Sequence, residues 1–112
     1  MAADEPLPAT GGSVGVALNF VGWEQSSDAV EASGFVSGVV EDGGTCRVTL
    51  TRGQHSVVAE TRGQADATTT VCPSVSLGGD QLSAGAWKAV LSYESGTSTG
   101  VSAPLEVEVP SR

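Results

Sequence analysis

Hydrophobic and polar residues alternate with a period of two along most of this chain, which is the pattern of β-strands that bury one face. The alternation is clearest in residues 13–20, 45–52, 86–93 and 101–109. The side chains that we expect to point inward from these four segments are Val14, Val16, Leu18 and Phe20; Cys46, Val48 and Leu50; Trp87, Ala89, Leu91 and Tyr93; and Val101, Ala103, Leu105, Val107 and Val109.

Three further segments are predicted to form strands, but their alternation does not define one inward face. Residues 30–40 are apolar, but two alternations compete, one through Phe35 and the other through Val36. Residues 56–61 follow a hairpin turn at Gly53-Gln54, and residues 68–77 form a Thr-rich and Val-rich run. In that run Cys72 has the opposite parity to Val75. Either Pro73 resets the facing of the strand, or the cysteine lies at a strand end.

Turn signals separate these segments. Glu41-Asp42-Gly43-Gly44 and Gly78-Gly79-Asp80 are the strongest, and residues 94–100 predict a hairpin loop. The result is about seven short antiparallel strands with no convincing helix, which is typical of an immunoglobulin-like β-sandwich. We therefore predict an all-β domain over residues 13–110, preceded by a Pro/Gly-rich linker over residues 1–12.

Composition and charge narrow the class of protein. The 112 residues include 13 Asp and Glu but only five Lys and Arg, for a net charge of −8. Such an acidic chain repels phosphate backbones, so we expect no nucleic-acid partner. No segment is long and apolar enough to insert into a membrane, and no signal peptide is visible. If the domain is exported, its leader or anchor has been removed.

Cys46 and Cys72 are the two cysteines. Two cysteines and one histidine cannot close a zinc site, and their spacing is not that of a C-x-x-C redox motif. In a small β domain with a thin core we expect one disulfide, which would contribute about 3–4 kcal/mol by loop entropy. It would also imply an oxidising compartment. The alternative is two free buried thiols in a cytosolic protein.

The reactive side chains of this sequence do not form a pattern typical of an enzyme, so we predict a non-catalytic protein. His55 is the only histidine and lies beside the hairpin turn, where we expect it to be solvated. A nucleophile, a base and an orienting group cannot be assembled around it, so we assign no catalytic or cofactor-binding residue. The acidic pairs Asp4-Glu5 and Glu41-Asp42 could attract calcium, but we favour a solvated acidic surface and predict no metal site.

Two features suggest interactions. Residues Leu7 to Gly11 read L-P-A-T-G, which resembles the recognition site of sortases. Such sites stand before an apolar span and a basic tail, whereas here a whole domain follows, so we interpret the string as a linker coincidence. Trp23 is the aromatic outside a clear core face. It either caps the open end of the sandwich or contacts a glycan or protein ligand from a loop.

Residues 82–93 carry a resemblance to known protein families. Leu82, Gly85 and Trp87 are similar to the corner between two strands of fibronectin type III and bacterial immunoglobulin-like domains, and residues 44–50 resemble a middle strand of the same modules. The Ala, Gly, Val and Thr richness resembles extracellular domains of actinobacterial type. Trp87 follows both cysteines, so the antibody pattern is not met.

The resemblance implies a non-catalytic module, a spacer or display domain of a cell-surface or secreted bacterial protein such as an adhesin. Its expected partners are neighbouring domains. The alternative function is a binding module for a glycan or protein ligand, using Trp23 and nearby loops.

Overall fold

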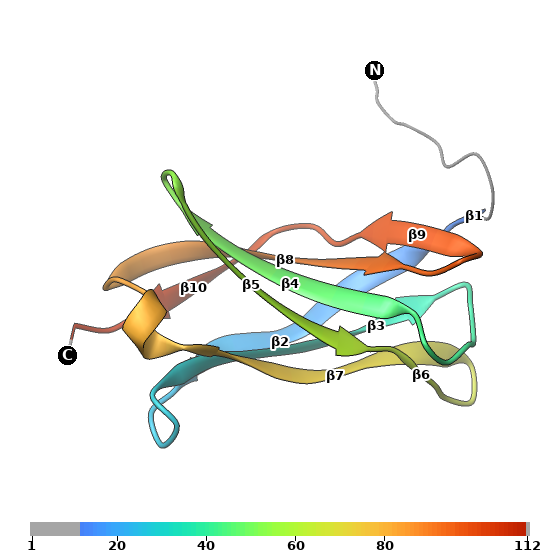
Figure 1. Ribbon diagram of the computed structural model, residues 1–112, viewed down its shortest axis with the longest axis horizontal. Coiled ribbons are helices and arrows are strands. Elements are labelled where there is room, and N and C mark those ends of the chain that lie inside the picture. Colours follow the sequence, from blue (N-terminus) through green and yellow to red (C-terminus); the bar gives the residue numbers. More distant parts are fainter. Residues whose placement is uncertain (1–11, 112) are drawn as a thin grey trace.

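Two β-sheets packed face to face make up the computed structural model, which describes residues 12–111 (Figure 1). The first sheet has the order β2-β3-β7-β6, and its neighbours are all antiparallel. Its strands are β2 (Gly15–Glu24), β3 (Ala29–Ser37), β6 (Gln64–Ala65) and β7 (Thr69–Gly78).

The second sheet has the order β1-β9-β8-β4-β5, with β10 also paired to β8. Since β4 pairs along one side of β8, the strands β9 and β10 follow each other along the other side. Its pairs are antiparallel except for β1 and β9. Its strands are β1 (Gly12–Ser13), β4 (Thr45–Arg52), β5 (His55–Arg62), β8 (Gly85–Glu94), β9 (Ser98–Val101) and β10 (Leu105–Val109).

The core lies between the two sheets, where the inward faces of the strands meet. Valine, leucine and alanine fill most of it, together with two aromatic residues, Trp87 and Tyr93, whose exposed fractions are each 1%. The one helical turn in the described part of the chain is η1 (Gly79–Gln81), a 3-10 turn between β7 and β8. The all-β prediction is therefore confirmed, and the alternation in β4 and β8 identifies their buried residues correctly.

The strand pattern differs from the expected seven in three places. Residues 12–13 and 64–65 add two short strands, so Gly12, expected in the linker, already pairs with Ser98. The rest of that linker, including Leu7 to Gly11, lies outside the described residues. The predicted final strand is interrupted around Pro104, which has no N–H to give to a ladder. Its second part forms β10, whereas β9 includes only Val101 from it and begins at Ser98, inside the predicted hairpin loop.

This division changes the facing of the last strand. Val101 and Leu105 are 63% and 43% exposed, although both were predicted to point inward with Val107. Ser102 is buried instead. Its backbone N–H donates to the carbonyl of Leu91, and its hydroxyl accepts from the Leu91 N–H at 2.9 Å. The serine hydroxyl thus supplies a ladder bond that the interrupted backbone does not.

Pro73 resets the facing of β7, as the first of the two alternatives proposed. Cys72 is opposite Gly34 and Val75 is opposite Ala32, so two residues of β7 face the single Ser33. This bulge leaves Pro73 without a required ladder partner and brings Cys72 and Val75 to the same buried face. In β3 the alternation through Val36 prevails, because Val36 is fully buried and Phe35 is partly exposed.

A second bulge, in β2, corrects the prediction for Phe20. Leu18 pairs with Gly34 and Phe20 with the adjacent Ser33, so Asn19 is the extra residue. Phe20 is consequently 52% exposed, and the residues beyond the bulge, Val21 and Trp23, pack against the core in its place.

Candidate functional site

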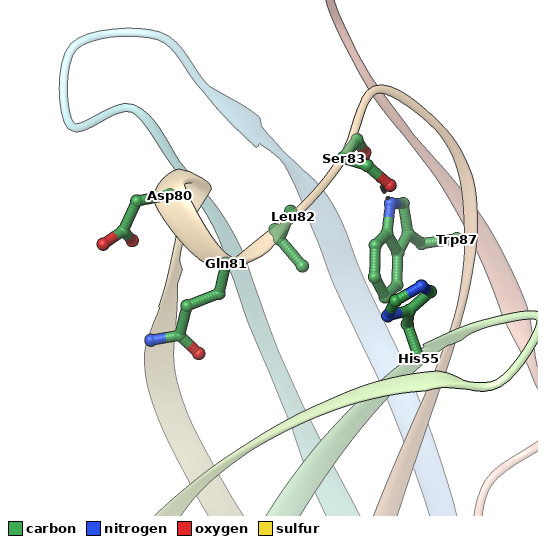
Figure 2. A pocket seen from close by; sticks show the side chains of 6 residues that line it. All are labelled: His55, Asp80, Gln81, Leu82, Ser83 and Trp87. Atoms are coloured by element: carbon green, nitrogen blue, oxygen red, sulfur yellow. Dashed lines mark hydrogen bonds between the residues drawn. The ribbon is translucent and has the colours of Figure 1, made fainter.

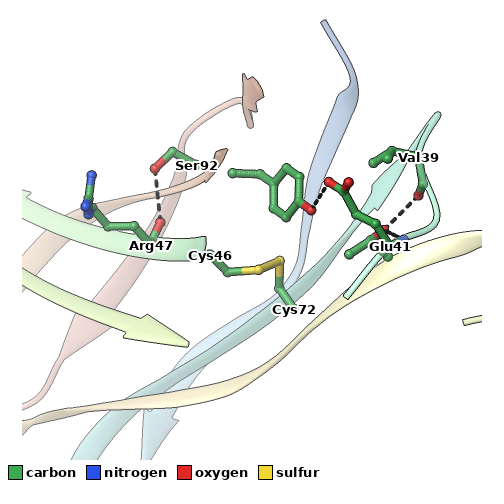
Figure 3. Close-up of a disulfide and its surroundings, with 8 residues drawn as sticks. Val39, Glu41, Cys46, Arg47, Cys72 and Ser92 are labelled. Atoms are coloured by element: carbon green, nitrogen blue, oxygen red, sulfur yellow. Dashed lines mark hydrogen bonds between the residues drawn. A yellow bond between two sulfur atoms is a disulfide. The ribbon is translucent and has the colours of Figure 1, made fainter. Parts of the chain in front are cut away.

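The disulfide joins the two sheets, connecting Cys46 of β4 to Cys72 of β7 (Figure 3). Its Cα atoms are 5.9 Å apart, within the range that an unstrained backbone allows, and both residues are only 1% exposed. The predicted pairing is confirmed. The link also indicates an oxidising environment, because thiols in the cytosol are normally kept reduced.

Beside the disulfide, Glu41 collects hydrogen bonds from several parts of the chain (Figure 3). Its carboxylate accepts one from the hydroxyl of Tyr93 on β8 and another, at 3.0 Å, from the hydroxyl of Thr97 in the β8–β9 connection. Its backbone N–H donates to the hydroxyl of Thr70 at 3.1 Å, and this hydroxyl donates to the carbonyl of Val39. One acidic residue thereby fastens the β3–β4 connection to both sheets.

The hydrogen bonds of this cluster shift the pKa values of Glu41 and Tyr93. Hydrogen bonds from Ser95 and Tyr93 lower the pKa of the Glu41 carboxyl, because they favour its charged form. Burial, followed by the bond to Glu41, raises the pKa of the Tyr93 hydroxyl to about 12. The proton therefore stays on the tyrosine at neutral pH, and the pair is a charge-assisted hydrogen bond with a structural role.

The acidic pair Glu41-Asp42 was expected on a solvated acidic surface; Asp42 is exposed and Glu41 partly exposed, and both also make hydrogen bonds within the protein. Besides the contacts of Glu41, a carboxylate oxygen of Asp42 accepts a hydrogen bond from the backbone N–H of Ala65 at 2.8 Å. Within residues 12–111, no group of three or more His, Cys, Asp or Glu side chains is placed to hold a metal ion. The other pair, Asp4-Glu5, lies outside the described residues.

Trp23 lies near the end of β2 and is half-buried, packed against the core cluster. Its neighbour is Gly79 of η1, where a Cβ atom would come within 2.7 Å of the indole ring. Gly79 therefore has to be a glycine for the turn to lie this close to the ring. The contact fits the interpretation that Trp23 covers the open end of the sandwich, whereas its ligand contact stays a prediction.

At the same end of the molecule, an open hollow of about 280 Å³ lies between the β4–β5 hairpin and the β7–β8 connection (Figure 2). His55 and Trp87 form one side, Asp80 and Gln81 the other, and Leu82 lies between them. The sixth lining residue is Ser83. His55 is exposed, as predicted, and it lines the hollow together with Trp87.

Two hydrogen bonds fix the wall of this hollow. The indole N–H of Trp87 donates to the backbone carbonyl of Ser83 at 2.8 Å, which sets the orientation of the ring. The guanidinium of Arg52 donates to the Ser83 hydroxyl, also at 2.8 Å. Trp87 lies in the core, as its parity predicted. The alternation does not indicate the hollow, because the lining residues come from separate strands and one connection.

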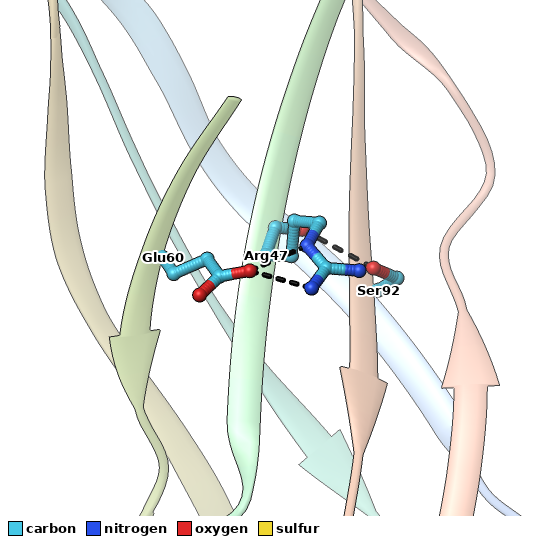
Figure 4. A network of polar contacts seen from close by, with 3 residues as sticks. All are labelled: Arg47, Glu60 and Ser92. Carbon is cyan, nitrogen blue, oxygen red and sulfur yellow. Dashed lines mark hydrogen bonds and ion pairs between the residues drawn. The ribbon is translucent and has the colours of Figure 1, made fainter. Parts of the chain in front are cut away.

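The outer face of the second sheet carries an ion pair between Arg47 and Glu60 on neighbouring strands (Figure 4). The Arg47 Nε donates to Glu60 at 2.7 Å, and both side chains are nearly half exposed. Pairs this exposed contribute about 0–1 kcal/mol. The contact orders the surface and has no evident chemical role.

Comparisons with known proteins add no assignment: no family model, curated protein sequence or solved structure matches this chain. Among the described residues, no helix is long and apolar enough to cross a membrane.

Proposed function

We propose that this chain is a non-catalytic immunoglobulin-like module that spaces or displays neighbouring domains of an extracellular or cell-surface protein. The sheet orders support the fold family. The order β2-β3-β7-β6 corresponds to strands A-B-E-D of such sandwiches, and β9/β10-β8-β4-β5 corresponds to G-F-C with an added edge strand. The disulfide supports an oxidising location outside the cytosol.

The observation that carries the spacer proposal is the position of the two chain ends. The first strand, β1, pairs through β9 next to Glu94 at the end of β8, whereas Val109 of β10 pairs with Gly85 at its beginning (Figure 1). The chain therefore enters at one end of the sandwich and leaves at the other. A domain built in this way extends a row of modules by its full length.

The disulfide gives this spacer a limit to its extension. The segment between Cys46 and Cys72 spans 26 residues in the middle of the load path, and the sulfur bridge bypasses it when the ends are pulled. At about 3.5 Å per residue, this segment represents about 90 Å of chain, of which the 5.9 Å between the two Cα atoms remains available. An oxidised module that unfolds under load would thus lengthen by about 85 Å less.

Single-molecule stretching of tandem copies tests the proposal. We expect discrete unfolding events in the oxidised protein, with a contour-length gain about 85 Å shorter than in the Cys46→Ala/Cys72→Ala variant. A gain that is the same in both proteins would show that the link does not shield the segment. Oxidised copies that extend without discrete events would refute a load-bearing spacer.

Trp23 bears on the alternative, a binding module centred on that residue. Its half-buried position against η1 supports a packing role, and this favours the spacer over a ligand site at Trp23 itself.

A further inference from the structure

We propose that the hollow between the β4–β5 hairpin and the β7–β8 connection binds one neutral sugar ring. The inference goes beyond the spacer role and does not depend on it. It rests on the polar groups of the rim, the residues that close the bottom of the hollow and the size of the hollow (Figure 2).

The rim offers hydrogen-bond donors and acceptors side by side. The Gln81 amide supplies both, the Asp80 carboxylate accepts, and the His55 imidazole donates from one nitrogen and accepts at the other when neutral. All three residues are exposed and reach the hollow from two different elements. Such a mixed set matches sugar hydroxyls, each of which donates and accepts.

The fourth polar group, Ser83, is held ready to donate. Its hydroxyl oxygen already accepts from Arg52 at 2.8 Å, so its own hydrogen remains for another acceptor. A donor bound to a charged group is polarised by it, which strengthens the bond that it makes in turn. Arg52 does not itself line the hollow, so a ligand there would contact the Ser83 hydroxyl and not the guanidinium.

Charge selects a neutral ligand over an anionic one. Asp80 lines the hollow directly, and the chain as a whole carries a net charge of −8, so a carboxylate or phosphate would be repelled. Behind the rim, Leu82 and Trp87 are 3% and 1% exposed and close the bottom of the hollow. They offer a ligand little apolar area, so most of its contacts would be hydrogen bonds between its hydroxyls and the rim.

Size limits the ligand to one ring. Pockets for drug-sized molecules measure about 300–1,000 Å³, and this hollow, at about 280 Å³, falls just below that range. A single ring in an open site makes few contacts, so we expect a Kd of about 1–10 mM. The site would hold a terminal sugar of a longer chain and gain strength when several modules act together.

The test is an NMR titration of the ¹⁵N-labelled protein with methyl glycosides of glucose, galactose, mannose and N-acetylglucosamine. We expect at least one to give saturable shifts at the backbone of Gln81 and Ser83 and at the Trp87 indole N–H. The His55→Ala/Gln81→Ala variant changes two exposed side chains and should fold normally. It should bind the same glycoside at least about tenfold more weakly.

Gln54→Ala is the matched control, because Gln54 is exposed in the same hairpin but does not line the hollow. It should bind like the unaltered protein. The proposal is overturned if none of the four glycosides gives a saturable shift, or if the double variant binds as well as the control. Shifts confined to the Trp23 indole would overturn it too, by placing the ligand on the other side of η1.

Discussion

The hydrogen bond between Glu41 and Tyr93 should stabilise the fold measurably, and a double-mutant cycle can isolate its contribution. Glu41→Gln removes the charge but keeps an amide oxygen that can accept from the tyrosine. Tyr93→Phe removes the donor and leaves the ring in the core. Combining both changes separates the coupling between the two groups from the separate effects of each substitution.

The expected magnitude follows from the burial of the donor. Tyr93 is 1% exposed, so its hydroxyl has little access to water that could replace its partner. Hydrogen bonds to charged groups contribute about 1.5–3 kcal/mol, against about 0.5–1.5 kcal/mol for neutral ones. We therefore expect each single variant to lose about 1–2 kcal/mol, with a coupling energy of about 1 kcal/mol. For a domain of this size, each lost kcal/mol lowers Tm by about 5 °C.

The pH dependence gives an independent check on the same pair. The pKa of Glu41 is lowered in the folded state, so its contribution is present above the ordinary carboxyl range and is lost as pH falls through the folded-state pKa. The pKa of Tyr93 is raised to about 12, so its contribution holds below pH 10 and disappears as pH rises from there through about 12. Tyr93→Phe should lack this alkaline loss.

Urea unfolding followed by circular dichroism, at pH 7, 4, 3 and 11, measures all four proteins. Glu60→Gln is the control, because it removes a carboxylate whose partner, Arg47, is nearly half exposed on the outer face. It should change the free energy of unfolding by less than about 0.5 kcal/mol. A coupling energy indistinguishable from zero, or an acid sensitivity that is unchanged in Glu41→Gln, would refute the reasoning.

Two further substitutions test the core. Cys46→Ala/Cys72→Ala should lower the free energy of unfolding by about 3.5 kcal/mol, the loop-entropy value for a separation of 26 residues; chemical denaturation would measure it, and a loss below about 1 kcal/mol would contradict it. Gly34→Ala should cost about 2–3 kcal/mol or more, because its Cβ would lie 2.2 Å from the carbonyl oxygen of Ala17. Gly96→Ala, where a Cβ meets nothing within 4 Å, should cost less than 1 kcal/mol in the same thermal or urea assay, and similar losses at both glycines would rule out the steric explanation.

The elements that the sequence predicted best are those with uninterrupted alternation. Residues 45–52 form one strand with Cys46, Val48 and Leu50 buried, because a regular strand must place every second side chain on the same face. The same regularity identified the buried face of β8, including Tyr93. The disulfide was predictable because the chain contains two cysteines and a thin core.

What the sequence could not predict depends on contacts between distant segments. Nothing near Phe20 in the sequence signals a bulge, since the extra residue is defined only by the partner strand. The role of Glu41 depends on Tyr93, 52 residues away, and a carboxylate beside a turn is usually solvated. The hollow around His55 likewise requires the hairpin and the β7–β8 connection to meet. One signal could have suggested this hollow. Arg52 and His55, which pair at the hairpin end, fall on the inward-facing side of the alternation although both are polar.

The two bulges lie at one level of the first sheet, on either side of Ser33. In β2 and β7, the extra residue changes which set of alternating side chains faces the core on the two sides of this level. The strand between them, β3, keeps one alternation throughout. A relative of this domain that lost Asn19 would lose the bulge but could keep the pairs Leu18–Gly34 and Phe20–Ser33, so Phe20 would stay outside and Trp23 would stay against the core. Alignments of such relatives should therefore place single-residue gaps at this level, where one residue separates two phases of the same strand.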